Sequence, residues 1–244
     1  MTFEPSQMPL GVRLADAATL DAFEPMPDTL ALPWLRARLA EIERQRGRGE
    51  RGWLWGAPGS GRSHLLQAAC HGTEAAGGRA IYLPAEAVAR VPEAALADLE
   101  RCDLIAVDDV DALLGDVAAE AALFDLCNRM LDRAGPSLLL FAAAAPPLAS
   151  GARLADLASR LAAATVFRVP MLDDAGRGRA LRRRAARRGI ELDARTVDYI
   201  LSHHARSAAA LFALLDDLDL ASLSAQRRIT IPFVRERLAR LEAR

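Results

Sequence analysis

The sequence contains no lysine. All 31 basic residues are arginines, and against 32 aspartates and glutamates they leave a net charge of −1. This balance argues against a protein whose whole surface binds nucleic acid. Cysteine is also scarce, because the chain has only Cys70, Cys102 and Cys127. They are odd in number, widely spaced and without a CxxC pair, which speaks against a disulfide framework or a zinc site and fits a reducing compartment.

Long apolar runs are absent as well. No stretch approaches the roughly 18 unbroken apolar residues of a membrane span, and the first residues, MTFEPSQMPLG, lack the basic and apolar regions of a secretory signal. We therefore expect a soluble, cytoplasmic protein with no membrane partner. With 52% hydrophobic residues, the 244 residues can bury a full core in one domain or in two small ones.

Short apolar runs alternate with helical patterns over the first two thirds of the chain. Five strands with intervening helices predict an α/β fold with a parallel sheet covered on both faces. A further helix, residues 34–45, precedes them and is closed by the turn GRGERG. The predicted strands are 53–55, 80–83, 104–107, 138–141 and 165–169, and the predicted helices are 63–76, 86–99, 118–133 and 154–161.

The architecture changes between Pro170 and Asp174, where the strand signal ends. The remaining residues predict a small all-helical domain with helices at 173–188, 194–203, 207–225 and 231–244. The stretch RGRALRRRAARRG, residues 177–189, is strongly basic. It could touch DNA, but the acidic LLDDLDL later in the same domain favours a solvated helix face held by salt bridges.

Residues 53–69, WLWGAPGSGRSHLLQAA, have the layout of a phosphate-binding loop: a buried strand, a glycine-rich turn and the start of a helix. In the pattern Gly-x4-Gly-Lys-[Ser/Thr], backbone N–H groups cradle phosphates and the hydroxyl ligates Mg²⁺. Gly56, Gly61 and Ser63 fit this pattern, and Arg62 takes the lysine position. Glycine-rich turns also occur for packing reasons, so the motif needs support from elsewhere in the chain.

That support comes from LIAVDD, residues 104–109, an apolar strand that ends in Asp108 and Asp109. In a Walker B strand, one such acid lies near Mg²⁺ at the carboxyl end of a parallel strand. A buried strand followed by an acidic turn is the simpler alternative. At this spacing the two elements together predict a P-loop nucleotide fold.

Several stretches now resemble a known family: GAPGSGRSHLL, LIAVDDVDAL, FDLCNRML, LADLASRL and LDDLDLASLSAQRRITIPFVRERL. They are similar to the AAA+ ATPases of the DnaA group, and within it to the Hda family of regulatory inactivators of the replication initiator DnaA. The resemblance runs from Gln7 to Leu241. It implies an AAA+ domain with a five-stranded parallel sheet at 13–170 and a helical lid at 171–244, after a flexible clamp-binding leader at 1–12.

The family's nucleotide site transfers position by position. The resemblance implies that the chain binds ADP or ATP with Mg²⁺, with Ser63 and Asp108 as metal ligands. The sensor I and sensor II positions hold Ala144 and Ala209, with Arg206 as a possible substitute nearby. Since arginine is longer and planar where lysine is compact, we expect binding to survive better than turnover. The nucleotide-binding residues implied are Phe23, Gly56, Gly59, Gly61, Arg62, Ser63, His64, Asp108 and Asp109; Phe23 could instead act as a hydrophobic staple for the following helix.

Arg160, in ASRL, matches the family's arginine finger, which acts on nucleotide held by a neighbouring subunit. The alternative is an ordinary exposed arginine near a helix end. A trans-acting arginine stabilises transition-state charge. We therefore hypothesise that the protein is a poor ATPase alone but stimulates hydrolysis of DnaA-bound ATP and so prevents re-initiation of replication.

The leader carries QMPLGV, which resembles the peptide by which Hda proteins bind the DNA polymerase III β sliding clamp. Gln7 would be the polar anchor, and Met8, Leu10 and Val12 the apolar contacts of an extended chain. DNA would then be reached mainly through the clamp. AAA+ modules commonly pair through the face that carries the finger, so a homodimer remains open.

Two other function classes compete with this regulator. A stand-alone AAA+ ATPase of helicase-loader type should hydrolyse ATP by itself and retain polar sensor residues. Ala144 and Ala209 at the sensor positions count against this class. A non-hydrolysing adaptor would only tether DnaA to the clamp, and it would have no need to keep Ser63, Asp108 and Asp109. The nucleotide content of the purified protein distinguishes the adaptor from the regulator.

Overall fold

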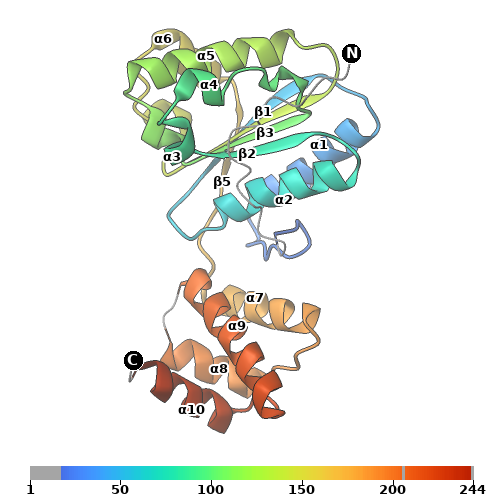
Figure 1. Cartoon of the computed structure of the whole chain (residues 1–244), viewed down its shortest axis with the longest axis vertical. Helices are drawn as coiled ribbons and strands as arrows, with labels where there is room; N and C mark the ends of the chain where they lie inside the picture. Colours follow the sequence, from blue (N-terminus) through green and yellow to red (C-terminus); the bar gives the residue numbers. More distant parts are fainter. Residues whose placement is uncertain (1–17, 205–206, 243–244) are drawn as a thin grey trace. The chain divides into compact units, whose positions relative to one another are not determined.

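The structure is a computed structural model that describes residues 18–204 and 207–242 (Figure 1). The chain divides into two compact units. Unit 1 runs to Phe23 and resumes over Asp28–Pro170, whereas unit 2 combines Glu24–Pro27 with the chain from Met171 onward. Residues 24–27 thus group with the helical unit, although they lie in the range that the sequence assigned to the first domain. The leader at 1–12 and Arg206 lie outside the described residues.

Unit 1 is built on a five-stranded sheet of order β2-β3-β4-β1-β5. All four strand pairings are parallel, and β1 lies between β4 and β5. The predicted parallel sheet is therefore confirmed. The strands are β1 Gly49–Trp55, β2 Ala80–Pro84, β3 Leu104–Asp108, β4 Ser137–Ala143 and β5 Thr165–Arg168.

Alternate side chains along the strands pack into two separate hydrophobic cores, one on each face of the sheet, because successive side chains of a strand point to opposite faces. On one face, Leu54, Leu104 and Leu140 pack with α1 and α2. On the other face, Trp53, Ile105 and others pack with α5 and α6, and Figure 1 shows these two helix layers on opposite sides of the sheet. The long helices are α1 Ala31–Glu43, α2 Arg62–Ala75, α5 Val117–Asp132 and α6 Ala155–Ala162.

The single helix predicted at 86–99 is wrong. The structure has α3 Ala85–Val88, α4 Pro92–Ala95 and a 3₁₀ turn Leu99–Arg101 in its place. Val91 precedes a proline, which disfavours the helical region, and its backbone is at φ −150°. Asp98 at φ 56° interrupts the chain again. Alanine-rich composition favoured a helix, but these two backbone positions break it.

The GRGERG turn is also shorter than expected, because β1 begins at Gly49. The turn proper lies at Gly47, whose φ is 102°. Gly52 lies within β1, where an added Cβ would be 2.7 Å from the Trp34 ring. Glycine there allows α1 to approach the strand closely.

Unit 2 contains four helices within its described residues, which confirms the prediction of an all-helical region after the sheet. They are α7 Asp174–Arg187, α8 Ala194–His203, α9 Ala208–Ala225 and α10 Ile231–Glu242. The side chains of Asp173, Asp193 and Ser207 cap the first three of these helices, as N-cap residues do. Leucines of α9 and aliphatic side chains of the other helices form the core of this unit.

The basic stretch of α7 forms salt bridges with α9, as predicted from the acidic LLDDLDL. Arg188 pairs with Asp216 at 2.7 Å, and Arg184 pairs with the same carboxylate at 3.3 Å. Glu24 adds a second group of ion pairs to α7 within unit 2. Its buried carboxylate lies 2.6 Å from Arg179 and 3.0 Å from Arg183. Among the residues that the structure covers, no helix combines the length and apolar character that crossing a membrane requires.

Candidate nucleotide site and finger helix

The loop between β1 and α2 depends on glycine at three positions. A Cβ on Gly56 would lie 2.3 Å from the carbonyl oxygen of Val169, so no side chain fits there. Gly59 and Gly61 have φ values of 81° and 98°, in the left-handed region that favours glycine. Gly61 is the N-cap of α2 and supplies no capping side chain. The first N–H groups of α2 are therefore available to an anion, which the helix dipole also favours.

Arg62, the first residue of α2, lies against Asp109, the residue that follows the predicted Walker B strand β3. It is 8% exposed, and its Nη2 donates to Asp109 Oδ1 at 3.2 Å. Its buried Nη1 has no hydrogen-bond partner within the described chain. Burial and the neighbouring Asp108 raise the pKa of Asp109, while Arg62 opposes that shift. The cation at the lysine position is thus held by an acid of the same site.

Asp108 ends β3, and its two oxygens have different partners. Oδ2 accepts a hydrogen bond from the Tyr82 hydroxyl at 2.5 Å, and Oδ1 accepts one from the Asp109 N–H at 3.1 Å. Burial, together with this bond to Asp108, raises the pKa of the Tyr82 hydroxyl. Tyr82 is therefore a donor that orients the carboxylate, a role the sequence pattern did not reveal.

Ala144, which the resemblance assigned to the sensor I position, lies at the same edge of the sheet. Ala144 follows β4 and is exposed, and its N–H donates to Asp111 Oδ2 at 3.2 Å. Its methyl group offers no polar atom to a phosphate. Ala209, which the resemblance assigned to the sensor II position, is exposed in the first turn of α9 in unit 2. Neither alanine can polarise a γ-phosphate.

The residues present fit a nucleotide phosphate with a metal. The glycine turn and the uncapped start of α2 can hold an anion, and the unpartnered Nη1 of Arg62 supplies positive charge. Ser63 lies in the first turn of α2, and Asp108 ends β3, which belongs to the same sheet as β1, the strand before the glycine turn. A hydroxyl and a carboxylate are oxygen ligands of the kind that Mg²⁺ takes. Buried Ser60, also in the loop, has an Oγ without a partner in the described chain.

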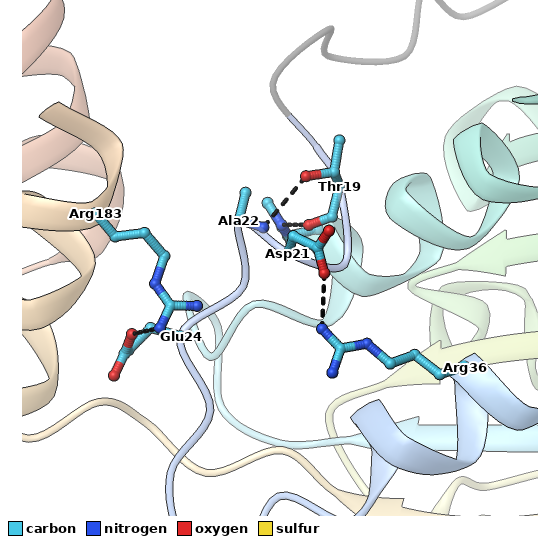
Figure 2. A network of polar contacts seen from close by, with 7 residues as sticks. Thr19, Asp21, Ala22, Glu24, Arg36 and Arg183 are labelled. Carbon is cyan, nitrogen blue, oxygen red and sulfur yellow. Dashed lines mark hydrogen bonds and ion pairs between the residues drawn. The ribbon is translucent and has the colours of Figure 1, made fainter. Parts of the chain in front are cut away.

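The segment before α1 folds against the start of α2. Phe23 is buried, and its ring lies 2.8 Å from where a Gly61 Cβ would be and 5.9 Å from the His64 ring. His64 Nε2 lies 3.0 Å from the carbonyl oxygen of Thr19. Figure 2 shows the turn that brings this segment in: the Ala22 N–H donates to Thr19, and Asp21 pairs with Arg36 of α1 at 2.8 Å. Phe23 and His64 are therefore placed beside the glycine loop.

Arg160 lies apart from this loop, on the layer that covers the opposite face of the sheet. Its helix, α6, packs through Leu157 and Leu161 into the core shared with α5. Arg160 itself is exposed and forms no salt bridge with any residue of 18–204 or 207–242. It borders an open groove of about 370 Å³ whose other lining residues are Phe124, Asp156, Ser159 and Ala163.

Sequence reasoning missed Glu120, a buried acid in α5. Its carboxylate accepts hydrogen bonds from the backbone N–H groups of Gly115, Arg153 and Leu154 at 2.6–2.9 Å. Burial opposes ionisation, but these backbone hydrogen bonds outweigh it and lower the pKa of Glu120. A lone acid in the apolar run VAAEAALF was the available signal.

Solved structures share this fold. The chain matches "Replication initiator DnaA bound to AMPPCP and single-stranded DNA" with a TM-score of 0.70 and 21% identity, over 85% of this chain and 66% of that one. It matches domain III of DnaA from Thermotoga maritima with a TM-score of 0.71 and 19% identity, over 91% and 95% of the two chains. A mutant form of RuvB from the same organism gives a TM-score of 0.68 and 18% identity, over 92% and 73%. This chain thus spans about two thirds of the first of these DnaA chains.

The chain therefore has the fold that these DnaA structures share. Residues 174–238 match the family model "Hda, lid domain". Over these residues the second unit is therefore similar to the lid domain of Hda, which confirms the resemblance expected from the sequence there.

Proposed function

We propose that this protein is a DnaA-related regulator of replication initiation with a nucleotide site of its own. ADP or ATP would bind at the loop of Gly56, Gly59 and Gly61, with its phosphates at the start of α2. Mg²⁺, held by Ser63 and Asp108, would neutralise phosphate charge. The glycine conformations and the uncapped helix support this proposal, and one of the similar DnaA structures is described as bound to AMPPCP.

The site's own turnover should be poor, because its cation is engaged and its sensor positions are apolar. Arg62 already bonds to Asp109, which the sequence assigns to the same site. The methyl groups of Ala144 and Ala209 replace polar side chains. Since phosphoryl transfer depends on charges aimed at the transferring group, each of these features lowers the rate.

Arg160 supports an action in trans on the ATP of DnaA, and its position is the observation that carries the proposal. It lies on the layer opposite α2, exposed and without an ion pair in the described chain, whereas a finger serving its own loop would be near that loop. A free guanidinium can stabilise charge on a phosphoryl group held by a neighbouring AAA+ module. DnaA is the proposed neighbour because the fold and the lid resemble DnaA and Hda.

The sliding clamp completes the proposal. The segment of Gln7, Met8, Leu10 and Val12 would hold the protein on DNA-loaded clamp in the cytoplasm, and no other contact with DNA is required. Tethering raises the effective concentration of the finger at clamp-bearing DNA. The hydrolysis of DnaA-bound ATP would then follow clamp loading and prevent re-initiation.

The test is single-turnover hydrolysis of γ-labelled ATP preloaded on DnaA, with and without this protein and clamp loaded on DNA. We expect acceleration only when both are present, and its loss in Arg160→Ala. Arg90→Ala is the matched control, because Arg90 is also exposed in unit 1 and lies outside the site. Unchanged stimulation by Arg160→Ala would refute the finger assignment, and retained clamp binding after deletion of residues 1–12 would refute the clamp motif.

A second candidate, the non-hydrolysing adaptor, is favoured by the bond between Arg62 and Asp109, which satisfies the site's charges without a ligand. It predicts no acceleration of hydrolysis while clamp binding is intact. The nucleotide released from the purified, denatured protein separates the two functions. Bound ADP supports the regulator, and an empty site supports the adaptor.

A further inference from the structure

We propose that Glu120 is a positioning residue for α6, the helix that carries Arg160, and that it acts on Arg160 from the opposite end of this helix. This inference rests on the proposed function of Arg160. Glu120 lies in α5, 40 positions before the finger, and is 2% exposed. The short helix α6 is what links the two residues.

The N-terminus of α6 is capped from outside the helix. Its N-cap, Leu154, has no side-chain oxygen, whereas α5, α7 and α9 have aspartate or serine at that position. Glu120 Oε2 accepts from the Leu154 N–H at 2.6 Å, and Oε1 accepts from the Arg153 N–H at 2.9 Å. A carboxylate at this point also interacts favourably with the helix dipole.

The same carboxylate fixes the loop that precedes α5. Oε1 accepts from the Gly115 N–H at 2.7 Å, so one buried group joins α5, the loop before it and the start of α6. The remaining attachment of α6 is small, because only Leu157 and Leu161 of this helix are buried. Arg160 lies in the last turn of this eight-residue helix. Because the helix is so short, we expect a change at its first turn to displace Arg160.

Positioning matters here because a finger must meet its phosphate within a narrow geometry. A displacement of about 1 Å can cost on the order of 100-fold in rate even when binding is intact. Glutamine at position 120 keeps the size of the side chain but replaces one acceptor oxygen by a donor NH₂ group, which faces backbone N–H groups. Glu120→Gln should therefore release the start of α6 without removing Arg160.

Asp116→Asn is the matched control. Asp116 is the N-cap of α5, four residues before Glu120, and its Oδ1 accepts from the Ala119 N–H at 2.8 Å. It is a carboxylate that caps α5 itself and not α6. Any general loosening of α5 should appear in both variants, whereas an effect through α6 should appear only in Glu120→Gln.

The first measurement is amide hydrogen exchange of the full-length protein alone. In Glu120→Gln the amides of Arg153, Leu154 and the first turn of α6 should exchange about tenfold faster or more, and in Asp116→Asn they should match the unaltered chain. Equal protection of α6 in both variants would overturn the positioning role. This readout needs no DnaA, so it stands even if the proposed function fails.

The second measurement is the stimulated hydrolysis of DnaA-bound ATP at half-saturating and saturating protein. Glu120→Gln should lower the saturated rate constant about tenfold or more while leaving the half-saturating concentration unchanged. The double variant with Arg160→Ala should be no slower than Arg160→Ala alone, because both changes remove the same action. The proposal would be overturned if the two substitutions together lowered the rate constant by the product of their separate effects. Full stimulation by Glu120→Gln would also overturn it. If the unaltered protein does not stimulate, it is the proposed function that fails.

Glu120→Asp serves if the glutamine variant does not fold. It keeps the charge but is one methylene shorter, so it cannot reach all three N–H groups from the same backbone position. We expect a smaller loss of stimulation, together with faster exchange confined to Arg153 and Leu154. Unchanged exchange and unchanged stimulation in this variant would also overturn the role of Glu120.

Discussion

Single residues of the site show which constraints are local. The three loop glycines follow from chain geometry that a sequence motif encodes, so the loop could be predicted from a few consecutive residues. The bond between Arg62 and Asp109 joins residues 47 positions apart, and Phe23 meets Gly61 across 38 positions. Such contacts depend on how the strands and the segment before α1 pack, and no local pattern specifies them.

Gly56 should not tolerate even alanine. Its Cβ would lie 2.3 Å from a backbone oxygen that cannot move independently of β5. We expect Gly56→Ala to lower the free energy of unfolding by about 1–3 kcal/mol or more, as overpacking does. Urea unfolding measures it. Gly77→Ala is the control, because Gly77 is at φ 81° with open space around it. It should lower the free energy of unfolding by only about 1–2 kcal/mol, through backbone strain. A smaller decrease in Gly56→Ala than in Gly77→Ala would contradict the clash at Gly56.

Asp109 should compete with nucleotide for Arg62. In Asp109→Asn the guanidinium loses its anionic partner, so we expect the affinity for ADP to rise about fivefold, equivalent to about 1 kcal/mol. Isothermal titration calorimetry measures this change. Asp111→Asn removes a nearby carboxylate that bonds to the Ala144 N–H, so it should leave the affinity unchanged. A weaker affinity in Asp109→Asn would mean that Asp109 itself helps to hold the ligand.

At the scale of elements, apolar runs located all five strands, and β3 and β4 are buried throughout, as parallel strands often are. The polar first half of β1, from Gly49, was not predicted, because the apolar run begins only at Trp53. Helix ends were less predictable where one backbone position decides them, as at Val91 and Asp98. The cap of α6 was not predictable at all. Glu120 belongs to a different helix, and its function as a cap exists only once α5 and α6 pack together.

Glu120 should also leave a signature in the pH dependence of stability. Its pKa is lowered in the folded protein from the ordinary value of 4.5, because backbone N–H groups hold the charged form. An acid with a lowered pKa binds fewer protons folded than unfolded, so its contribution is complete above pH 4.5 and is lost as the pH falls through the lowered pKa. Between about pH 3 and pH 6, the free energy of unfolding measured with urea should fall less steeply with decreasing pH in Glu120→Gln than in the unaltered protein. Identical slopes in the two proteins would contradict the lowered pKa of Glu120.

At the scale of the whole molecule, the two units are distinct in architecture, and both are discontinuous in sequence. Composition and periodicity located the change near Pro170 because strands stop there. They gave no sign that residues 24–27 group with the helical unit. That grouping depends on the buried Glu24 carboxylate and on Arg179 and Arg183, which lie far along the chain.

Glu24 should therefore stabilise unit 2. Its side chain is 6% exposed and pairs with Arg179 and Arg183, so Glu24→Gln should cost about 1–3 kcal/mol, as loss of hydrogen bonds to a charged group does. Hydrogen exchange of the α7 amides measures the opening free energy. Glu236, which also pairs with two arginines but is 43% exposed, is the control. Glu236→Gln should cost at most about 1 kcal/mol; equal costs would contradict the role of burial.

The membership of residues 24–27 in unit 2 has a consequence for how such modules can be recombined. A gene segment that starts at Met171 encodes all four helices of the described unit 2 but lacks Glu24, the anion that Arg179 and Arg183 share. The segment from Met171 onward therefore does not contain the whole of unit 2. A chimaera that exchanges it with a protein of similar fold must carry the matching piece of the N-terminal region as well.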